Sequence, residues 1–213
     1  MIYLIGGSPR CGKTTLAQFL SRQLSIPWLA TDTIESIVSE CISSSDFNKT
    51  FPKSVMRRQT KKSNDVMYTE FTPKQIARAY IKQSRAVWKA ISMLVSCELY
   101  EGRSFILEGY HIHPKLVSIL KKKYGSKNIK AIFLTKTNIE NIIAGSINHS
   151  SKTDWFVQKT KDYNTYMKIA EMVAELGLFF QDQAKKYNFK VLKMDNNFGK
   201  NMRFAERYLL SKT

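Results

Sequence analysis

The chain begins with Met1-Ile-Tyr-Leu-Ile5, followed by Gly6-Gly-Ser-Pro-Arg-Cys-Gly-Lys-Thr14. Residues Gly7 to Thr14 match G-x-x-x-x-G-K-[ST], the phosphate-binding P-loop pattern. The apolar run before the motif predicts a buried strand, and Thr14-Thr-Leu-Ala-Gln-Phe-Leu20 predicts a helix after it. Glycines let such a loop wrap around a phosphate, with successive N–H groups pointing inward at a helix N-terminus. The stretch therefore predicts a nucleotide-binding site in an α/β fold.

Individual P-loop residues have separate predicted roles. Lys13 is expected to reach the β- and γ-phosphates of ATP, and the Thr14 hydroxyl is expected to bind Mg²⁺. The nucleotide-contacting residues predicted from the motif are Gly7, Ser8, Pro9, Arg10, Cys11, Gly12, Lys13, Thr14 and Thr15. Backbone N–H groups and Lys13 predict a lowered pKa for the Cys11 thiol. Two interpretations of Cys11 stay open, a redox role and a small residue that the loop tolerates, of which we favour the second.

The composition limits the classes of protein to which the chain can belong. With 213 residues, of which 43% are hydrophobic, a single domain with a sizeable core is predicted over 1–213. No apolar run approaches the ~20 residues of a membrane span. The first strand leads directly into the P-loop, which does not fit a signal peptide. Three cysteines without metal-like spacing, together with a nucleotide site, favour a cytoplasmic location.

The chain is strongly basic. It has 34 Lys and Arg against 17 Asp and Glu, a formal net charge of +17. Such a surface attracts polyanions, acidic membranes or phosphorylated substrates. The charges form short clusters along the chain and no basic tail, and no RNA- or DNA-binding module signature is present. Specific nucleic-acid binding is therefore an open, minority interpretation, and solvated helix faces are the favoured one.

Apolar strand candidates alternate with helical stretches, which predicts a parallel sheet covered on both faces. The expected strands are 1–5, 27–30, 104–108, 130–135 and 189–194. Capping boxes at Thr72-Pro-Lys-Gln75 and Thr137-Asn-Ile-Glu140 predict the starts of two helices, the first running to about Tyr100. A further helix is expected from about 161 to 187. Its apolar stripe favours core packing over the alternative of a dimer seam.

Two polar segments interrupt this alternation. Residues 43–71 are polar and basic with little periodicity, and residues 146–160 are polar and flanked by helices. Neither has the composition of a linker between domains. Both are expected to be insertions at the C-terminal edge of the sheet, where α/β proteins bind ligands. We interpret 43–71 as a substrate-side insertion and 146–160 as a lid.

Two acidic residues follow predicted strands. Asp32 is expected to accept a proton from an attacking hydroxyl or to orient it, with a helix N-cap, paired with Glu35, as the alternative. Glu108 is expected to bind Mg²⁺ directly or through water, as a Walker B carboxylate does, with a partnerless strand-end residue as the alternative. The predicted catalytic residues are thus Lys13, Asp32 and Glu108. The predicted Mg²⁺ ligands are Thr14 and Glu108.

Other candidate side chains lie on loops and insertions. A metal site at His111 and His113 is disfavoured because no acidic or cysteine partner has suitable spacing; contact of His111 with a substrate is a minority alternative. Pro114 is expected to open the next helix. In the loop after the last strand, Asn196 is expected to contact the nucleotide base, with an ordinary turn as the alternative.

A transferred phosphoryl group needs cations to neutralise the charge that builds up on it. The candidates are Arg57, Arg58, Arg78, Arg85, Lys152, Lys159 and Lys161. The expected lid has no Arg between 146 and 163, so Arg10 or a Lys must supply this charge. A Lys is a point charge and cannot form the bidentate fork of an Arg.

Taken in order, these motifs resemble those of small-molecule P-loop kinases. The order is a strand, the P-loop, a strand ending in Thr31-Asp32, a strand ending in Glu108-Gly109, and a lid after a fourth strand. The pattern is similar to the nucleoside monophosphate kinase branch, including shikimate and gluconate kinases and zeta-toxin-like kinases. Ala30-Thr-Asp-Thr-Ile34 and Ile106-Leu-Glu-Gly-Tyr-His-Ile-His-Pro114 look most like the 2-phosphoglycerate kinase-type subgroup.

The resemblance implies a three-layer α/β/α P-loop NTPase fold whose parallel five-stranded sheet has the order 2-3-1-4-5. It also implies MgATP as phosphoryl donor and a hydroxyl or phosphate as acceptor. Donor binding is implied for Gly7, Gly12, Lys13 and Thr14, and an acceptor or base role for Asp32. Glu108 departs from the Asp that is commoner at its position.

The predicted function is an ATP-dependent kinase acting on a small, anionic molecule, with ATP and Mg²⁺ as cofactors. One alternative is a polynucleotide 5′-hydroxyl kinase or nucleic-acid-binding ATPase, which the charge of +17 motivates. Another is a non-catalytic nucleotide switch. The sequence leaves the acceptor, the donor base and the oligomeric state open.

Overall fold

The computed structural model describes residues 1–148 and 155–211. Within these residues the chain forms one parallel five-stranded sheet with the order β2-β3-β1-β4-β5. The strands are β1 (Ile2–Gly7), β2 (Trp28–Ala30), β3 (Phe105–Glu108), β4 (Ile129–Thr135) and β5 (Val191–Lys193). Each expected strand is present, and no strand end is shifted by more than two residues. The strand order that the family resemblance implied is confirmed.

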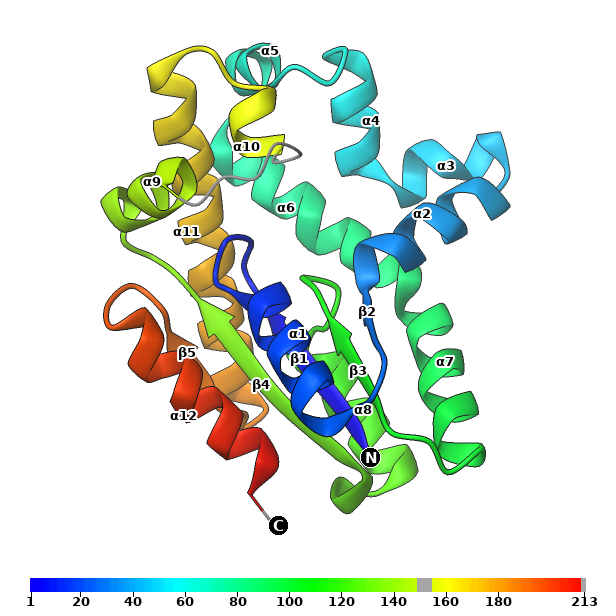
Figure 1. The fold of residues 1–213 in the computed structure, drawn as a ribbon. Coiled ribbons are helices and arrows are strands. Elements are labelled where there is room, and N and C mark those ends of the chain that lie inside the picture. The colour runs from blue at the N-terminus through cyan, green and yellow to red at the C-terminus, as the bar shows by residue number, and fades with distance from the viewer. Residues whose placement is uncertain (149–154, 212–213) are drawn as a thin grey trace.

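Helices cover both faces of the sheet (Figure 1). One layer contains α1 (Lys13–Leu24) and α12 (Phe198–Leu210), and the other contains α7 (Trp88–Tyr100), α8 (Pro114–Tyr124) and α11 (Tyr163–Lys186). Alternate residues of β1 serve the two layers: Tyr3 and Ile5 pack with α1, and Ile2 and Leu4 pack with α7 and α8. This alternation explains why the first strand is apolar throughout.

The apolar stripe of α11 packs inside the molecule. Ala170 and Val173 lie in a core formed by helices, and Phe180 and Ala184 lie against the sheet. The full stripe consists of Tyr163, Tyr166, Ala170, Val173, Gly177, Phe180, Ala184 and Tyr187. Tyr163 has 65% of its surface exposed, and Tyr166 and Tyr187 are half-buried. The expectation of core packing is therefore confirmed for the stripe residues from Ala170 to Ala184, which are buried within the chain.

A helical layer lies above the C-terminal edge of the sheet (Figure 1). It consists of α2 (Thr31–Cys41), α3 (Ser44–Thr50), α4 (Pro52–Gln59), α5 (Asn64–Glu70), α6 (Pro73–Ser84), α9 (Ile139–Asn148) and α10 (Trp155–Gln158). Met67, Ile76, Ile142 and Phe156 are buried in its own core, together with residues of α11. Segment 43–71 thus holds three helices, each too short to show a clear apolar period in the sequence.

The helix that begins at the Thr72 capping box ends earlier than expected. The box is present, with Thr72 and Gln75 exchanging side-chain and backbone hydrogen bonds. However, α6 stops at Ser84, a 3₁₀ turn η1 (Arg85–Val87) follows, and α7 begins at Trp88. The expectation of one helix to Tyr100 was therefore wrong. The two halves have different partners, because α6 packs on α11 in the helical layer and α7 packs on the sheet.

The second predicted capping box is also wrong. The backbone N–H groups of Thr137 and Asn138 both donate to Asp195 Oδ1 at 2.8 Å. Helix α9 starts at Ile139, and Asn138 Oδ1 accepts from the N–H of Asn141 at 2.8 Å. The helix is therefore capped by Asn138, one residue after Thr137, while the carboxylate of Asp195, in the loop after β5, binds the two residues that precede the helix. A second 3₁₀ turn, η2 (Ser126–Asn128), precedes β4.

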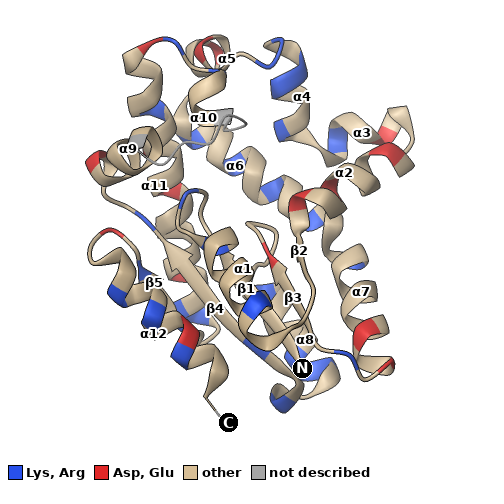
Figure 2. Ribbon diagram, viewed as in Figure 1, with Lys and Arg blue, Asp and Glu red and all other residues tan. Residues whose placement is uncertain are grey.

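No helix within 1–148 and 155–211 combines the length and apolar character of a membrane span. Lys and Arg are spread over the outer helices, including α4, α8 and α12 (Figure 2).

We expect His113 to make the stability of the fold depend on pH. Its Nδ1 accepts from the N–H of Lys115 at the start of α8, and its buried Nε2 has no hydrogen-bond partner among the described residues. Burial, followed by the charges of Arg85 and Lys115, lowers its pKa from 6.5 to about 4. Below about pH 6.5 the unfolded chain binds a proton that the folded chain does not, so stability falls as the pH drops toward 4.

We expect His113 to account for about 3 kcal/mol of lost unfolding free energy between pH 7 and 4. Urea unfolding at several pH values measures it. The variant His113→Asn keeps a side-chain acceptor at the N-cap and should remove most of this pH dependence. An unchanged slope in the variant would contradict the assignment.

Candidate functional site

The P-loop lies between the end of β1 and the start of α1. Gly7 has φ +128°, and a Cβ there would lie 1.8 Å from the carbonyl oxygen of Leu134 in β4. Gly12, in the left-handed region with φ 86°, is the N-cap of α1. Both positions therefore need glycine, one for close approach to β4 and both for backbone conformation. The loop has the conformation and the helix N-terminus that an anion site requires.

Lys13 folds back over the loop. Its ammonium donates to the carbonyl oxygen of Ser8 at 2.7 Å, and only 8% of the residue is exposed. Cys11 is fully buried, with Sγ 2.9 Å from the hydroxyl of Ser8. Burial raises the pKa of the Cys11 thiol and outweighs the opposing charge of Lys13. The prediction of a lowered thiol pKa was therefore wrong.

Thr14 and Glu108 meet beside the P-loop. The Thr14 hydroxyl donates to Glu108 Oε1 at 2.8 Å. Burial raises the pKa of the Glu108 carboxyl, while the charge of Lys13 and the hydrogen bond from Thr14 act against that rise. A hydroxyl and a carboxylate are the hard oxygen donors that Mg²⁺ takes in proteins. This pair fits the Mg²⁺ role that the sequence predicted for it.

Asp32 lies in the first turn of α2 and is exposed at the cavity described below. Helix α2 begins one residue earlier than Asp32, with Ala30 as its N-cap, and no side chain in the described part of the chain caps it. The alternative of an N-cap role for Asp32 is therefore wrong.

Glu35, the expected capping partner of Asp32, instead accepts hydrogen bonds from three other side chains. Lys53 Nζ and His111 Nε2 each lie 2.7 Å from its carboxylate, and the Tyr110 hydroxyl donates to it as well. Burial alone would raise the pKa of Glu35, but His111 and Lys53 hold it well below its usual range. Asp32, Glu35 and His111 also bring possible metal-ligand atoms within 4.8 Å of one another. The Lys53 ammonium already neutralises Glu35. We therefore interpret Glu35, Lys53, His111 and Tyr110 as an ion-pair and hydrogen-bond network instead of a metal site.

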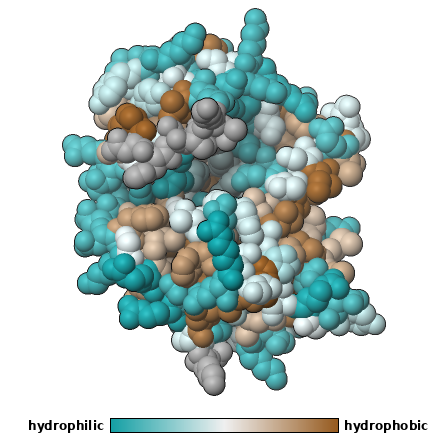
Figure 3. All heavy atoms as spheres, in the orientation of Figure 1, coloured by the Kyte–Doolittle hydropathy of each residue, from teal (hydrophilic) through white to brown (hydrophobic). Residues whose placement is uncertain are grey.

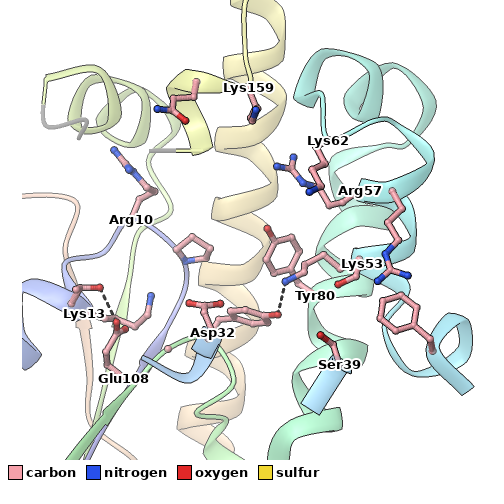
Figure 4. Close-up of a pocket in the computed structure, with 18 residues that line it drawn as sticks. Arg10, Lys13, Asp32, Ser39, Lys53, Arg57, Lys62, Tyr80, Glu108 and Lys159 are labelled. Carbon is pink, nitrogen blue, oxygen red and sulfur yellow. Dashed lines mark hydrogen bonds between the residues drawn. The ribbon is translucent and has the colours of Figure 1, made fainter. Parts of the chain in front are cut away.

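A cavity of about 680 Å³ opens between the P-loop and segment 43–71; we call it the insertion-side cavity. Among the described residues its cationic lining consists of Arg10, Lys13, Lys53, Arg57, Arg58, Lys62 and Lys159, and its acidic lining of Asp32 and Glu108. Figure 4 shows Asp32 between Lys13 on one side and Lys53 on the other. Figure 3 shows a hollow on this face with hydrophilic side chains at its border. The cavity favours a small anionic ligand.

Three of the cations predicted in or near the two polar segments line this cavity, as does Arg10 of the P-loop. Arg57, Arg58 and Lys159 are in its lining. Arg78, Arg85 and Lys161 are exposed elsewhere, outside the lining that the described residues form. Lys152 lies outside the described residues. Lys53 and Lys62 were missed, since an isolated Lys in a basic segment carries no distinctive signal.

Neighbouring side chains hold the insertion cations in place. The guanidinium of Arg57 donates to Asn64 Oδ1. Asn64 is fully buried; its side chain donates to Thr160 Oγ1 at 2.8 Å and its N–H donates to the carbonyl oxygen of Lys159 at 2.9 Å. The guanidinium of Arg58 stacks on the Phe47 ring at 3.8 Å. Asn64 therefore links segment 43–71 to the end of segment 146–160.

Arg10 connects the P-loop to the predicted lid. Its guanidinium donates to the hydroxyl and the carbonyl oxygen of Ser146 at 3.1 and 3.2 Å. It also lies over the Phe156 ring, 5.5 Å from the ring centre. Segment 146–160 has no Arg of its own, and Arg10 reaches its residues Ser146 and Phe156 from the P-loop side. Its role in charge neutralisation stays a prediction.

A second cavity, of about 710 Å³, lies on the other side of the P-loop; we call it the α12-side cavity. Its lining shares Arg10, Lys13 and Thr14 with the first cavity and adds Cys11, Gly12, Thr15, Lys136, Asn141, Ala144, Gly145, Met194, Asp195 and Phe198. Asn196 is not in this lining as the described residues form it, and its carbonyl oxygen accepts from Asn201 at 2.9 Å. Its base contact stays a prediction, with Asp195 and Phe198 as the neighbours that face the cavity.

His111 is fully buried, and both of its ring nitrogens have protein partners. It is absent from the lining of either cavity as the described residues form them. The alternative of direct substrate contact by His111 is therefore not supported, and its contacts point to a different role. Pro114 does open α8, as expected.

The sequence is similar to those of curated kinases. It is 25% identical over 193 residues to the 2-phosphoglycerate kinase of Methanocaldococcus jannaschii, an alignment covering 90% of this chain and 58% of that protein. It is 25% identical over 197 residues to the 2-phosphoglycerate kinase of Methanococcus maripaludis strain C6, covering 90% and 59%. The chain thus spans somewhat more than half the length of these relatives. No protein-family model matches the chain.

The fold is shared with solved structures. An uncharacterized protein from Eubacterium ventriosum superimposes with a TM-score of 0.52 over 99% of both chains, at 12% identity. This likeness concerns the fold alone. By its P-loop, its strand order and its sequence similarity to curated kinases, the chain is similar to the P-loop kinases of the nucleoside monophosphate kinase-like group.

Proposed function

We propose that the protein is an ATP-dependent kinase that transfers a phosphoryl group to a small anionic molecule. The observation that carries this proposal is the pair of cavities that share the P-loop residues Lys13 and Thr14. ATP would occupy the α12-side cavity with its phosphates on the loop, and the acceptor would occupy the insertion-side cavity. The reacting groups would then meet beside Lys13.

The P-loop side supplies charge stabilisation. Lys13 would exchange its contact with the Ser8 carbonyl for the β- and γ-phosphates, and loop N–H groups would bind the same oxygens. Thr14 and Glu108 would hold Mg²⁺, which neutralises phosphate charge when it is bound. Because these groups are fixed before the reaction, they need little reorganisation as charge develops.

Asp32 would act on the acceptor. Its carboxylate is exposed to the insertion-side cavity and is not used as a cap, so it is available to a hydroxyl group. In the proposed step the hydroxyl proton moves to Asp32 as the hydroxyl oxygen bonds to the γ-phosphorus. The bond between that phosphorus and the β,γ-bridging oxygen breaks, and ADP leaves with the electron pair.

The acceptor class follows from charge. The described lining carries the seven cations named above against two acids. A small acid that also bears a phosphate would match this excess, and the 25% identical relatives named 2-phosphoglycerate kinase support the same class. We therefore propose a phosphorylated hydroxy acid as the acceptor. We propose Arg57, which Asn64 holds at the cavity, as an anchor for its anionic group, because a guanidinium binds carboxylate or phosphate bidentately.

The test is acceptor-stimulated ADP release with Mg²⁺ and ATP. The panel contains phosphorylated and plain hydroxy acids, nucleoside monophosphates and 5′-hydroxyl oligonucleotides. We expect phosphorylated hydroxy acids to stimulate turnover, and Arg57→Ala to raise their KM at least about tenfold with little change in the KM for ATP. Arg78→Ala, on the exposed face of α6, is the matched control. Stimulation by oligonucleotides alone would replace this proposal with the polynucleotide alternative, and ATP binding without any stimulation would favour the switch.

A further inference from the structure

We propose that His111 is a positioning residue that, through Thr31 and Glu35, fixes Asp32 and Lys53 at the insertion-side cavity. This inference rests on the proposed function, because it assigns Asp32 to the acceptor. The His111 ring is buried behind the cavity. If it positions Asp32, turnover depends on a residue outside the P-loop.

The ring of His111 bridges the first turn of α2 from the inside. Its Nδ1 lies 2.8 Å from Thr31 Oγ1, and its Nε2 lies 2.7 Å from Glu35 Oε2. Thr31 and Glu35 are four residues apart, so both are on one face of the helix. Asp32 lies in the same turn and faces the cavity. The turn that carries Asp32 is therefore held at both ends by one side chain.

The hydrogen-bond pattern assigns the proton on the ring. Glu35 is ionised and can only accept, so His111 Nε2 carries the proton and donates to it. In the neutral ring Nδ1 then accepts from the hydroxyl of Thr31. One neutral tautomer thus satisfies both contacts inside the protein. A side chain with only one polar atom cannot make this bridge.

The same network fixes a cation of the insertion. Lys53 Nζ, on α4, donates to Glu35 Oε1 at 2.7 Å and to the Tyr110 hydroxyl at 3.0 Å. The Tyr110 ring packs on His111, with ring centres 3.8 Å apart. Glu35 is therefore the point at which α2, α4 and the loop after β3 meet. Without the His111 contact, the Glu35 carboxylate would keep only its hydrogen bonds from Lys53 and Tyr110.

The backbone supports this close contact. Gly109 precedes the network with φ +147°, and a Cβ there would lie 1.9 Å from Thr31 Oγ1. The loop after β3 therefore approaches α2 as closely as glycine allows. Such an approach sets the distance between His111 and the helix, so the position of Asp32 depends on the loop.

A displacement of about 1 Å in a reacting group can cost about a hundredfold in rate. Disturbing His111 should therefore lower kcat. The KM for ATP should change little, because Thr31, Glu35, Lys53 and His111 are absent from the described lining of the α12-side cavity. This split between kcat and the KM for ATP separates positioning from a general loss of structure.

The experiment compares His111→Gln, His111→Asn and Thr31→Val with the wild type in acceptor-dependent turnover. The amide nitrogen of Gln can take the place of Nε2 and keep the bond to Glu35, whereas Asn can replace only Nδ1. We expect kcat to fall about tenfold to a hundredfold in His111→Asn and less in His111→Gln. Introduced alone, Thr31→Val should lower kcat. Introduced together with His111→Gln it should lower kcat little further, because His111→Gln has already lost the bond to the Thr31 hydroxyl.

Unchanged kcat in all three folded variants would overturn the positioning role while the wild type still phosphorylates its acceptor. An equal fall in kcat and rise in the KM for ATP, with lower melting temperatures, would reduce His111 to a structural residue. Thr31→Val deletes one hydroxyl and keeps the shape of the side chain, so it tests the contact even if the His111 variants do not fold. A wild type inactive with every acceptor is the distinct result that rejects the proposed function itself.

Discussion

Replacing Lys13 by Ala is expected to lower acceptor-dependent turnover by about 10³-fold or more, equivalent to about 4 kcal/mol of transition-state stabilisation. The ammonium lies on the P-loop, 2.7 Å from the Ser8 carbonyl, and both cavities include Lys13 in their lining. It is therefore placed to neutralise the transferring group from the moment ATP binds. Loop N–H groups still contact the phosphates in the variant, so ATP binding should weaken much less than turnover.

The measurement is ADP release with saturating acceptor, accompanied by ATP titration and thermal unfolding of each protein. Lys74→Ala is the matched control, because Lys74 is also in the first turn of a helix but is exposed. Its turnover should equal that of the wild type. A folded Lys13→Ala protein that retains transfer would exclude the kinase mechanism proposed here.

Replacing Asp32 by Asn is expected to lower kcat by about 10²- to 10⁴-fold, the usual contribution of a general base. The amide has nearly the same shape as the carboxylate but cannot take the hydroxyl proton. Asp32 does not cap α2, and its side chain is exposed, so the fold should not change. The KM for ATP should stay the same, because Asp32 is absent from the described lining of the α12-side cavity.

Rapid-quench measurement of a single turnover isolates this step from product release. The control is Glu40→Gln, which removes an exposed carboxylate from the other end of α2. If Asp32→Asn raised only the KM for the acceptor and left kcat unchanged, Asp32 would bind the acceptor without taking its proton. That result would keep the kinase proposal and change the role of this residue.

Local patterns were sufficient for the P-loop, the strands and Asp32 as a cavity residue. The P-loop is a run of consecutive residues whose geometry depends mainly on Gly7 and Gly12. The strands are short apolar runs between helices, and parallel strands bring their C-terminal ends together at one edge of the sheet. For that reason the sequence could also place Thr14 and Glu108, 94 residues apart, side by side. They meet at 2.8 Å, and their Mg²⁺ role stays a prediction.

The sequence by itself determined the nucleotide-binding loop, the kinase-like order of elements and the excess of positive charge. Only the tertiary structure decided which side chains contact one another and which of them line the cavities. Asp195 accepts from the N–H of Thr137, just before α9, from 58 residues away, and Glu35 binds His111 from 76 residues away instead of capping α2. Lys53 lines the cavity because α4 folds over it. A carboxylate accepts hydrogen bonds from whichever donors lie nearest to it in space. The spacing of residues along the chain does not determine which donors the fold brings close.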